Sequence, residues 1–283
     1  MTSPRPRVGE RWALALLLLL VGGALGAELL EAVLGVSSTT PDLAHRSADA
    51  GFPHLLGTDE LGRDLFSRLL HAGRVSLLVG GAAAVGSSLI GVVVGVSAAV
   101  GGRTVDAALM RVTDGLLALP VLPLLLLASA VDAGSPTSLT SAVSRVVVLL
   151  AVMSWMPIAR LVRAQTIVTL GHDYVLAARA LGASWPRLFW RHVLPLVWPV
   201  IIVQTTLDVG SHLMAESALS FLGLGVQAPA ASWGQMMIGA LDTLKTDPPA
   251  VLAPGACIVA TVVSVQRLGD ALRDRLRERQ ELF

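Results

Sequence analysis

Four polar side chains recur at every fourth position within an otherwise apolar stretch late in the chain. They are Gln204, Asp208, His212 and Glu216. Each step of four residues along an α-helix drifts by only about 40°, so these side chains would share one face. Ionisable groups inside a membrane are costly and usually face a bundle interior or a water-filled path. Two interpretations stay open: the face lines or gates a polar path, or it forms a polar seam against a partner subunit.

Motifs for self-sufficient catalysis are missing from the sequence. There is no GxxxxGK[ST] loop to cradle a nucleotide phosphate, and the only lysine is Lys245. The HExxH, GxSxG and clustered Cys/His patterns are also absent. The single cysteine, Cys257, excludes an intrachain disulfide. We therefore expect a non-catalytic chain with no cofactor or metal of its own, and active transport through it would need energy from another chain or from an ion gradient.

The elements that carry these residues are predicted to be membrane-spanning helices. Only 14% of the 283 residues are charged, and the mean hydropathy is +0.70, whereas soluble domains carry about 25% charged residues. A spanning helix needs about 20 mostly apolar residues. Six stretches qualify, at about residues 12–30, 75–102, 105–131, 139–159, 193–219 and 248–266. The sequence thus predicts an all-α integral membrane protein, and its net charge of +1 gives no indication of a nucleic-acid partner.

The distribution of basic residues predicts the orientation of the six spans. With the N-terminus inside, the outer segments hold only Arg46, Arg63, Arg68, Arg74, Arg145 and Lys245, and the inner segments hold the other 15 of 21. This bias predicts that both termini are cytoplasmic. The first span has an alternative interpretation as a cleaved signal peptide, because a basic start precedes it and the small residues Ala24, Gly26 and Ala27 follow.

For several single residues we expect only a structural role. Small residues recur every fourth position on the second span, at Ser87, Gly91, Gly95 and Ala99, and would let helices approach closely. We expect a local ion pair in a turn around Asp59, Arg63 and Asp64, and a paired or interfacial charge at Asp114. Further expectations are interfacial arginines at Arg160 and Arg163, a flexible turn at Gly223 and Gly225, and interfacial positions for Pro229 and Trp233.

The basic segment between the fourth and fifth spans predicts a short helix. Ala, Leu and Arg are frequent from Asp173 onwards and favour helix, and Gly182 suits a C-terminal stop. Asp173 can cap the start of this helix and favours its positive dipole end. A short amphipathic helix of this kind can lie on a membrane surface or dock into a partner.

At this segment the sequence resembles the EAA loop of ABC importer permeases, whose pattern is E-A-A-x3-G-x9-I-x-L-P. Ala177, Ala178, Gly182, Leu194 and Pro195 match, whereas Leu176 replaces the Glu and His192 the Ile. Three further stretches resemble the C-type permease of the dipeptide, oligopeptide and nickel class. These are HLLGTDELGRD at 54–64, AESALSFLGLGVQ at 215–227 with SWG at 232–234, and LGDALRD at 268–274. The resemblance covers about residues 12 to 277.

The resemblance implies a type I importer fold with six helices and with both termini inside. It implies that Asp173, Tyr174, Ala177, Ala178, Leu181, Gly182, Leu194 and Pro195 belong to an ATPase-coupling element. The implied partners are a second, homologous permease, two ATPase subunits that bind ATP and Mg, and an extracytoplasmic solute-binding protein, in the lipid of a bacterial inner membrane. The chain would then form half of a translocation path for peptides, or alternatively for nickel chelates, glutathione or haem.

These implications divide the chain into five parts. They are a cytoplasmic N-terminus (1–11), a first transmembrane helix (12–34), an extracytoplasmic segment (35–74), a five-helix core (75–268) containing the coupling loop (160–195), and a cytoplasmic tail (269–283). Two other classes of protein compete with this one. A secondary transporter would need internal repeats, which the halves do not show, and an intramembrane protease would need a second catalytic Asp to accompany Asp270.

Overall fold

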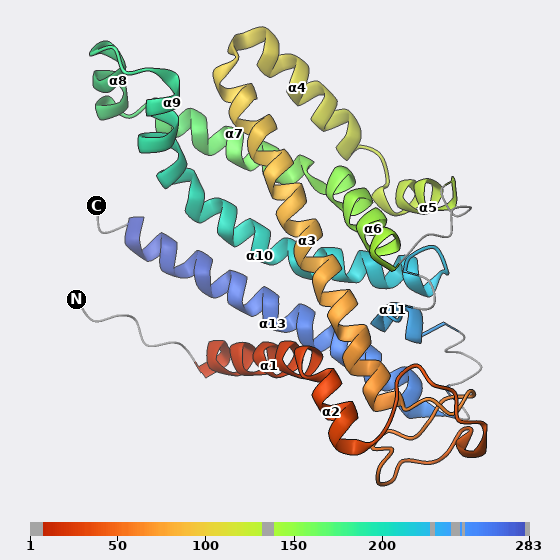
Figure 1. The fold of residues 1–283 in the computed structure, drawn as a ribbon. Coiled ribbons are helices and arrows are strands. Elements are labelled where there is room, and N and C mark those ends of the chain that lie inside the picture. Colours follow the sequence, from red (N-terminus) through yellow and green to blue (C-terminus); the bar gives the residue numbers. More distant parts are fainter. Residues whose placement is uncertain (1–7, 132–138, 227–229, 239–243, 245–246, 281–283) are drawn as a thin grey trace.

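The structure is a computed structural model that describes residues 8–131, 139–226, 230–238, 244 and 247–280 (Figure 1). Within these ranges the regular elements are helices, and the β pairing is limited to an isolated bridge between Thr58 and Asp64. The sequence features at Gln227, Pro229 and Lys245 lie outside the described residues. The predicted all-α class is confirmed.

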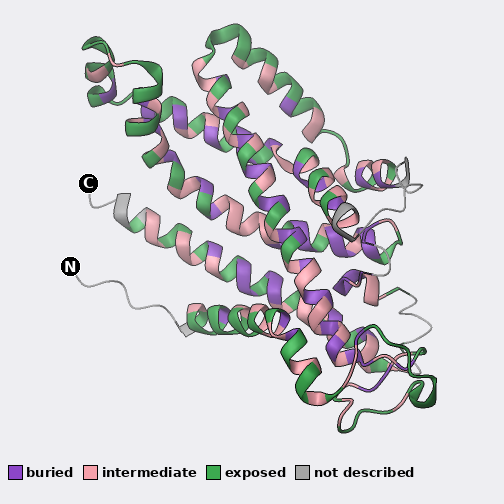
Figure 2. Cartoon of the chain, viewed as in Figure 1, coloured by how far each residue is buried: buried purple, intermediate pink, exposed green. Residues whose placement is uncertain are grey.

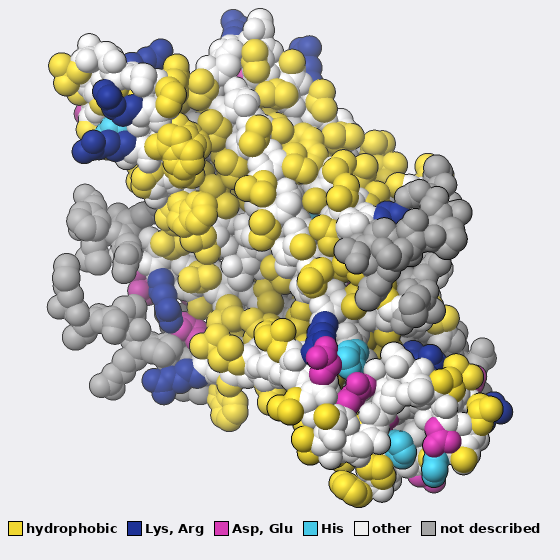
Figure 3. Space-filling model, in the orientation of Figure 1, with side chains coloured by type: hydrophobic (Ala, Val, Ile, Leu, Met, Phe, Trp, Pro, Cys, Tyr) yellow, Lys and Arg dark blue, Asp and Glu magenta, His cyan; other side chains and the backbone are white. Residues whose placement is uncertain are grey.

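Three of the spans are long, apolar helical runs. They are α3 (Leu65–Val100), the run Trp185–Phe221 that ends in α10 (Leu194–Phe221), and the Pro248–Leu276 part of α13 (Pro248–Gln280). At 36 residues, α3 is about 54 Å long and exceeds the roughly 30 Å of a bilayer core. Hydrophobic side chains cover the middle of the visible face, whereas charged side chains gather towards its ends (Figure 3). This distribution suits a molecule that crosses a membrane.

The other three spans are pairs of helices that meet at a bend. The pairs are α1 (Val8–Leu25) with α2 (Ala27–Leu34) at 63°, α4 (Gly102–Leu117) with α5 (Val121–Val131) at 82°, and α6 (Leu139–Ser154) with α7 (Met156–Leu170) at 48°. If each pair is one span the total is six, as hydropathy predicted. The prediction of a continuous helix across 105–131 is wrong, because Pro120 lies in the break and has no N–H to continue the helix.

The helix of the fourth span extends beyond the predicted span. We expected the span to end near Ala159, with Arg160 and Arg163 at the lipid headgroups, and α7 continues to Leu170. Arg163 Nη2 donates to Asp106 Oδ2 on α4 at 2.6 Å, and Arg160 Nη1 lies 3.6 Å from Asp114 Oδ1. Both arginines thus find carboxylates on α4, and the prediction that Asp114 is paired is confirmed.

The start of α1 and the end of α13 lie at the same end of the bundle (Figure 1). The helix α13 runs beyond the predicted sixth span to Gln280, and Arg275 pairs with Glu10 on α1. At the opposite end of α1, Arg74 Nη2 on α3 donates to the carbonyl of Leu25 at 2.7 Å. These contacts, and the burial of Ala24 and Ala27, pack the first span against the bundle.

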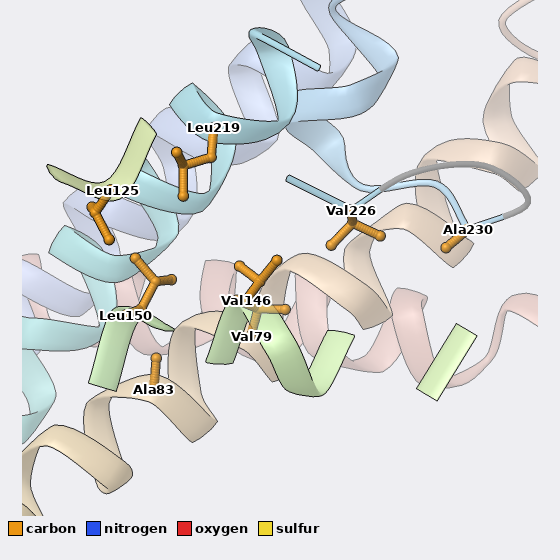
Figure 4. Packing of buried hydrophobic residues seen from close by; sticks show 8 residues of the cluster. All are labelled: Val79, Ala83, Leu125, Val146, Leu150, Leu219, Val226 and Ala230. Atoms are coloured by element: carbon orange, nitrogen blue, oxygen red, sulfur yellow. The ribbon is translucent and has the colours of Figure 1, made fainter. Parts of the chain in front are cut away.

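The long helix α3 runs through the middle of the bundle and packs on α6, α7 and α10. A Cβ on Gly91 would lie 2.9 Å from the carbonyl oxygen of Trp155, and one on Gly95 2.5 Å from that of Ala159. The predicted close approach of small residues is therefore confirmed, with α7 as the neighbour. Nearer the other end, side chains from α3, α5, α6 and α10 meet in an apolar cluster, which includes Val79, Ala83, Leu125, Val146, Leu150 and Leu219 (Figure 4).

The segment before α3 folds into a cap at the end of the bundle opposite the termini. Asp59 Oδ2 accepts from Arg63 Nη2 at 2.8 Å and from Arg68 Nη1 at 2.7 Å, and Asp64 Oδ2 caps α3 by accepting from Ser67 N at 2.7 Å. The predicted turn with a local ion pair is confirmed.

The prediction that Trp233 is an interfacial residue is wrong. Trp233 begins the short helix α11 (Trp233–Met236), is only 2% exposed, and donates through Nε1 to the carbonyl of Leu69 at 2.9 Å. Gly73 leaves room for its ring, since a Cβ there would lie 3.0 Å from Trp233 Cζ2. The glycine at 225 likewise serves close packing rather than flexibility, because a Cβ would lie 2.6 Å from the backbone nitrogen of Ser220.

Candidate functional site

The expected coupling element is a short helix that projects from the bundle. The helix α8 (Asp173–Ala180) begins after His172, so Asp173 is not its N-cap as predicted, although it lies in the first turn where an acidic side chain meets the positive dipole end. Gly182 has φ +84°, and its N–H donates to the carbonyl of Arg179 at 3.0 Å. The predicted helix and its stop at this glycine are confirmed.

Most residues of α8 are exposed (Figure 2). Val175 is the one buried residue of α8, whereas Tyr174 is 50% exposed. Leu181, which follows the helix, is 89% exposed. Ala177 is exposed and Ala178 is half-buried, and a Cβ on Gly182 would meet nothing within 4 Å. The structure thus presents a small apolar surface with open space around the turn.

The chain passes from α8 into α10 through two short helices. These are α9 (Trp185–Leu188) and the π-helix η2 (Phe189–Val193). Leu194 and Pro195 form the first turn of α10, where a proline is tolerated because the first N–H groups of a helix have no intrahelical partner. The two residues thus lie at the foot of the helix that carries the polar face.

Three of the four polar residues on α10 follow one another along the helix. Gln204 Nε2 donates to Asp208 Oδ1 at 2.8 Å, and both side chains are half-buried. His212 Nδ1 donates to the carbonyl of Asp208 at 2.7 Å, and His212 is only 3% exposed. Its Nε2 is buried and has no hydrogen-bond partner among the described residues. The arrangement leaves Gln204 and Asp208 as the members with some access to a neighbour or to water.

Glu216 has different surroundings from the other three. It is 0% exposed, accepts from Ser220 Oγ at 2.7 Å, and accepts from Ser76 Oγ on α3 at 3.3 Å. Ser76 Oγ in turn accepts from the backbone nitrogen of Trp233 at 3.0 Å. A carboxyl enclosed in this way joins α3, α10 and α11 within one chain, and its place in the translocation path stays a prediction.

Sequence reasoning missed the partners of these residues. Ser76 and Asp106 lie far from Glu216 and Arg163 in the sequence, and no local pattern marks them. The ring of His192, noted before only as a departure from the family pattern, lies 5.8 Å from that of Tyr174. A search of the described residues finds no group of three His, Cys, Asp or Glu side chains able to hold a metal ion.

Comparison with protein families decides the class of this molecule. Residues 91–278 match the family described as "Binding-protein-dependent transport system inner membrane component". The chain belongs to this family. The match begins in the second half of α3, ends within α13, and includes both α8 and the polar face of α10. The protein is therefore the permease component of a binding-protein-dependent transport system, with the six-span fold that the resemblance implied.

Named relatives of this permease are similar over most of their length. A putative peptide permease protein of Brucella suis is 39% identical over 85% of this chain and 78% of its own. The oligopeptide transport system permease protein OppC of Bacillus subtilis is 37% identical over 84% and 76%. The di/tripeptide transport system permease protein DppC of Pseudomonas aeruginosa is 41% identical over 78% and 71%.

Proposed function

We propose that this permease forms half of the path by which an ATP-driven ABC importer carries peptides across a bacterial inner membrane. The names of the relatives support peptides as the substrate class, since they include peptide, oligopeptide and di/tripeptide permeases. The half-buried pair Gln204 and Asp208 supports a polar path along α10, because an unused carboxylate is costly within a membrane. Nickel chelates, glutathione and haem are the competing substrates, and uptake assays with labelled di- and oligopeptides discriminate among them.

The proposed complex contains a second, homologous permease, two ATPase subunits and an extracytoplasmic solute-binding protein. In this proposal the chain itself is non-catalytic and binds no cofactor, and the ATPase subunits bind ATP and Mg. The absence of a phosphate-cradling motif from the full sequence supports this division of labour.

We further propose that α8 and the turn at Gly182 dock into a cleft of an ATPase subunit. The observation that carries this assignment is the combination of exposure and shape: a helix that buries only Val175, closed by a glycine with φ +84° and with open space around it. A helix that packs so little on its own chain gains stability from a partner. The residues assigned to the coupling element are Asp173, Tyr174, Ala177, Ala178, Leu181 and Gly182, with Leu194 and Pro195 at the foot of α10.

The test is a substitution of Gly182→Arg in the assembled complex. An arginine side chain at this φ adds backbone strain of about 1 kcal/mol, and it fills the space where the walls of the ATPase cleft would lie. The substitution does not touch the membrane bundle. We expect normal membrane insertion and pairing with the second permease, but loss of the ATPase subunits in pull-down and loss of peptide uptake.

The matched control is Gly102→Arg. Gly102 has φ +81°, has nothing within 4 Å of an added Cβ, and is the first residue of α4. The substitution Gly102→Arg therefore imposes the same backbone strain without touching α8, and it should leave ATPase recovery unchanged. Wild-type recovery and uptake with Gly182→Arg would remove α8 as the coupling element.

A further inference from the structure

The helix α8 meets the elements that follow it through side-chain rings. The Tyr174 ring stacks on that of His172, with centroids 5.5 Å apart and an interplanar angle of 14°. The same ring lies 5.8 Å from that of His192 on η2, at 49°. Nearby, the Arg179 guanidinium lies 5.7 Å from the centre of the Trp185 ring on α9. Rings from α8, α9 and η2 thus hold three short elements together as one unit.

His192 lies where this unit joins the membrane helix. It belongs to η2, whose neighbouring Val193 is only 1% exposed and packs in an apolar cluster with Val197 and Ile201 of α10. The first backbone N–H of α10, on Leu194, donates to the carbonyl of Phe189 five residues earlier. A single π-helical turn is uncommon and occurs frequently at functional sites, where its weaker geometry can readjust.

The covalent connection between α8 and α9 would transmit a displacement of α8 poorly by itself. It consists of Leu181 to Ser184, in which Leu181 and Gly182 are exposed and Gly182 occupies the left-handed region. A displacement of α8 would be absorbed by rotation in this loop unless another contact bypassed it. The Tyr174–His192 ring contact joins the first turn of α8 directly to η2 and so provides that bypass.

We propose that Tyr174 and His192 are positioning residues that transmit a displacement of α8 to α10, and so to Gln204 and Asp208. This inference rests on the proposed function, because it assumes that an ATPase moves α8. Tyr174 acts through its ring rather than as a docking contact. Coupling between distant sites needs packed elements with two arrangements, and the π-helical turn at the foot of α10 is the element that would rearrange.

The experiment uses the complete complex in proteoliposomes, with its solute-binding protein and a labelled dipeptide. Three quantities are measured: ATPase subunits recovered with the permease, ATP hydrolysed, and peptide taken up per ATP. Aromatic pairs of this kind shift a coupled equilibrium about two- to tenfold. Tyr174→Ala and His192→Ala should each lower peptide uptake per ATP by about that factor, with wild-type ATPase recovery.

Conservative variants separate ring contact from other roles. Tyr174→Phe and His192→Phe keep a ring at each position and should retain peptide uptake per ATP. The double variant Tyr174→Ala/His192→Ala should be no worse than the more affected single variant, because both remove the same contact. Trp190→Ala is the control on η2, since the ring of Trp190 packs against Phe189 rather than against Tyr174, and it should leave the ratio unchanged.

Two outcomes would overturn the inference. Unchanged peptide uptake per ATP in both alanine variants would show that the ring contact transmits nothing. Loss of ATPase recovery with Tyr174→Ala, but not with His192→Ala, would assign Tyr174 to docking instead. The Gly182→Arg variant tests docking independently of these variants. A wrong transmission route and a wrong coupling element therefore give different results.

Discussion

Two carboxyl side chains on α10 lie about two helical turns apart and differ in what surrounds them. Glu216 is enclosed by serine hydroxyls of its own chain. Asp208 is half-buried, and among the described residues its carboxylate accepts a hydrogen bond from the side chain of Gln204 alone. A buried polar group with its hydrogen bonds satisfied rigidifies the structure. Glu216 therefore serves the packing of α11 on α3, and Asp208 is the carboxylate of this face that remains for a permeant or a partner.

The residue-scale prediction concerns Asp208→Asn. Asparagine keeps the size of the side chain and an oxygen to accept from Gln204, but it removes the charge. Hydrogen bonds to charged groups exceed those to neutral groups by about 1 kcal/mol, so we expect peptide uptake to fall about fivefold while the complex assembles normally. Uptake in proteoliposomes and co-purification of the second permease measure the two effects.

A matched control for Asp208→Asn is Thr206→Ala on the same helix. Thr206 Oγ1 donates to the carbonyl of Ile202 within α10, so its removal should change neither uptake nor assembly. If Asp208→Asn instead prevents co-purification of the second permease, the polar face is a seam between subunits, which is the alternative interpretation of this face.

At the scale of elements, the fold depends on how closely α3 approaches its neighbours. The glycines at 91 and 95 leave room for the backbone of α7, and two arginines of α7 reach carboxylates on α4. The helices α3, α4 and α7 are thereby fixed to one another, and α7 leads directly towards α8. We infer that the end of the molecule bearing α8 is built on this three-helix unit.

The element-scale prediction compares two glycines of α3. An alanine Cβ at Gly91 would lie 2.0 Å from Ile158 Cγ2 and 2.9 Å from the carbonyl oxygen of Trp155, so Gly91→Ala must push α7 away. Overpacking of this kind costs about 1–3 kcal/mol. At Gly81 nothing lies within 4 Å of an added Cβ, and Gly81→Ala should stabilise the helix by about 0.5–1 kcal/mol.

Thermal unfolding of the detergent-purified complex measures both glycine variants. The Tm should fall for Gly91→Ala and stay equal or rise for Gly81→Ala. Equal Tm values for the two variants would mean that α3 and α7 are not in the close contact described here.

At the scale of the whole molecule, α8, the start of α1 and the end of α13 lie at the same end of the bundle, and the cap before α3 lies at the other (Figure 1). The distribution of basic residues predicts that the end with α8 is cytoplasmic. A transporter that takes energy from an ATPase on one side and substrate from a binding protein on the other requires this separation.

Reporter fusions test the predicted orientation. A reporter at residue 5 and another after Phe283 should both report the cytoplasm, because the basic residues concentrate on that side. A reporter inserted at Gly51, which is exposed in the cap, should report the opposite side. A periplasmic signal from the C-terminal fusion would contradict the topology, and it would place α8 away from any cytoplasmic ATPase.

Local patterns in the sequence determined the class of the molecule, the existence of six spans, and the helix that Gly182 closes. Hydropathy and helical periodicity depend on nearby residues, and the same locality put Gln204 and Asp208 on one face. Tertiary structure alone decided which charges are satisfied. Arg160 and Arg163 are paired because α4 supplies Asp114 and Asp106.

Tertiary structure also decided which polar and aromatic side chains are enclosed. Trp233 resembles an interfacial tryptophan in sequence, yet α3 accepts its indole N–H and Gly73 accommodates its ring. Glu216 shares a helix face with Asp208, yet Glu216 is enclosed. One of the hydroxyls that donate to it belongs to Ser76, which lies 140 positions away in the chain. The free energy of a buried polar group depends on partners that folding brings from distant segments, and no local pattern contains them.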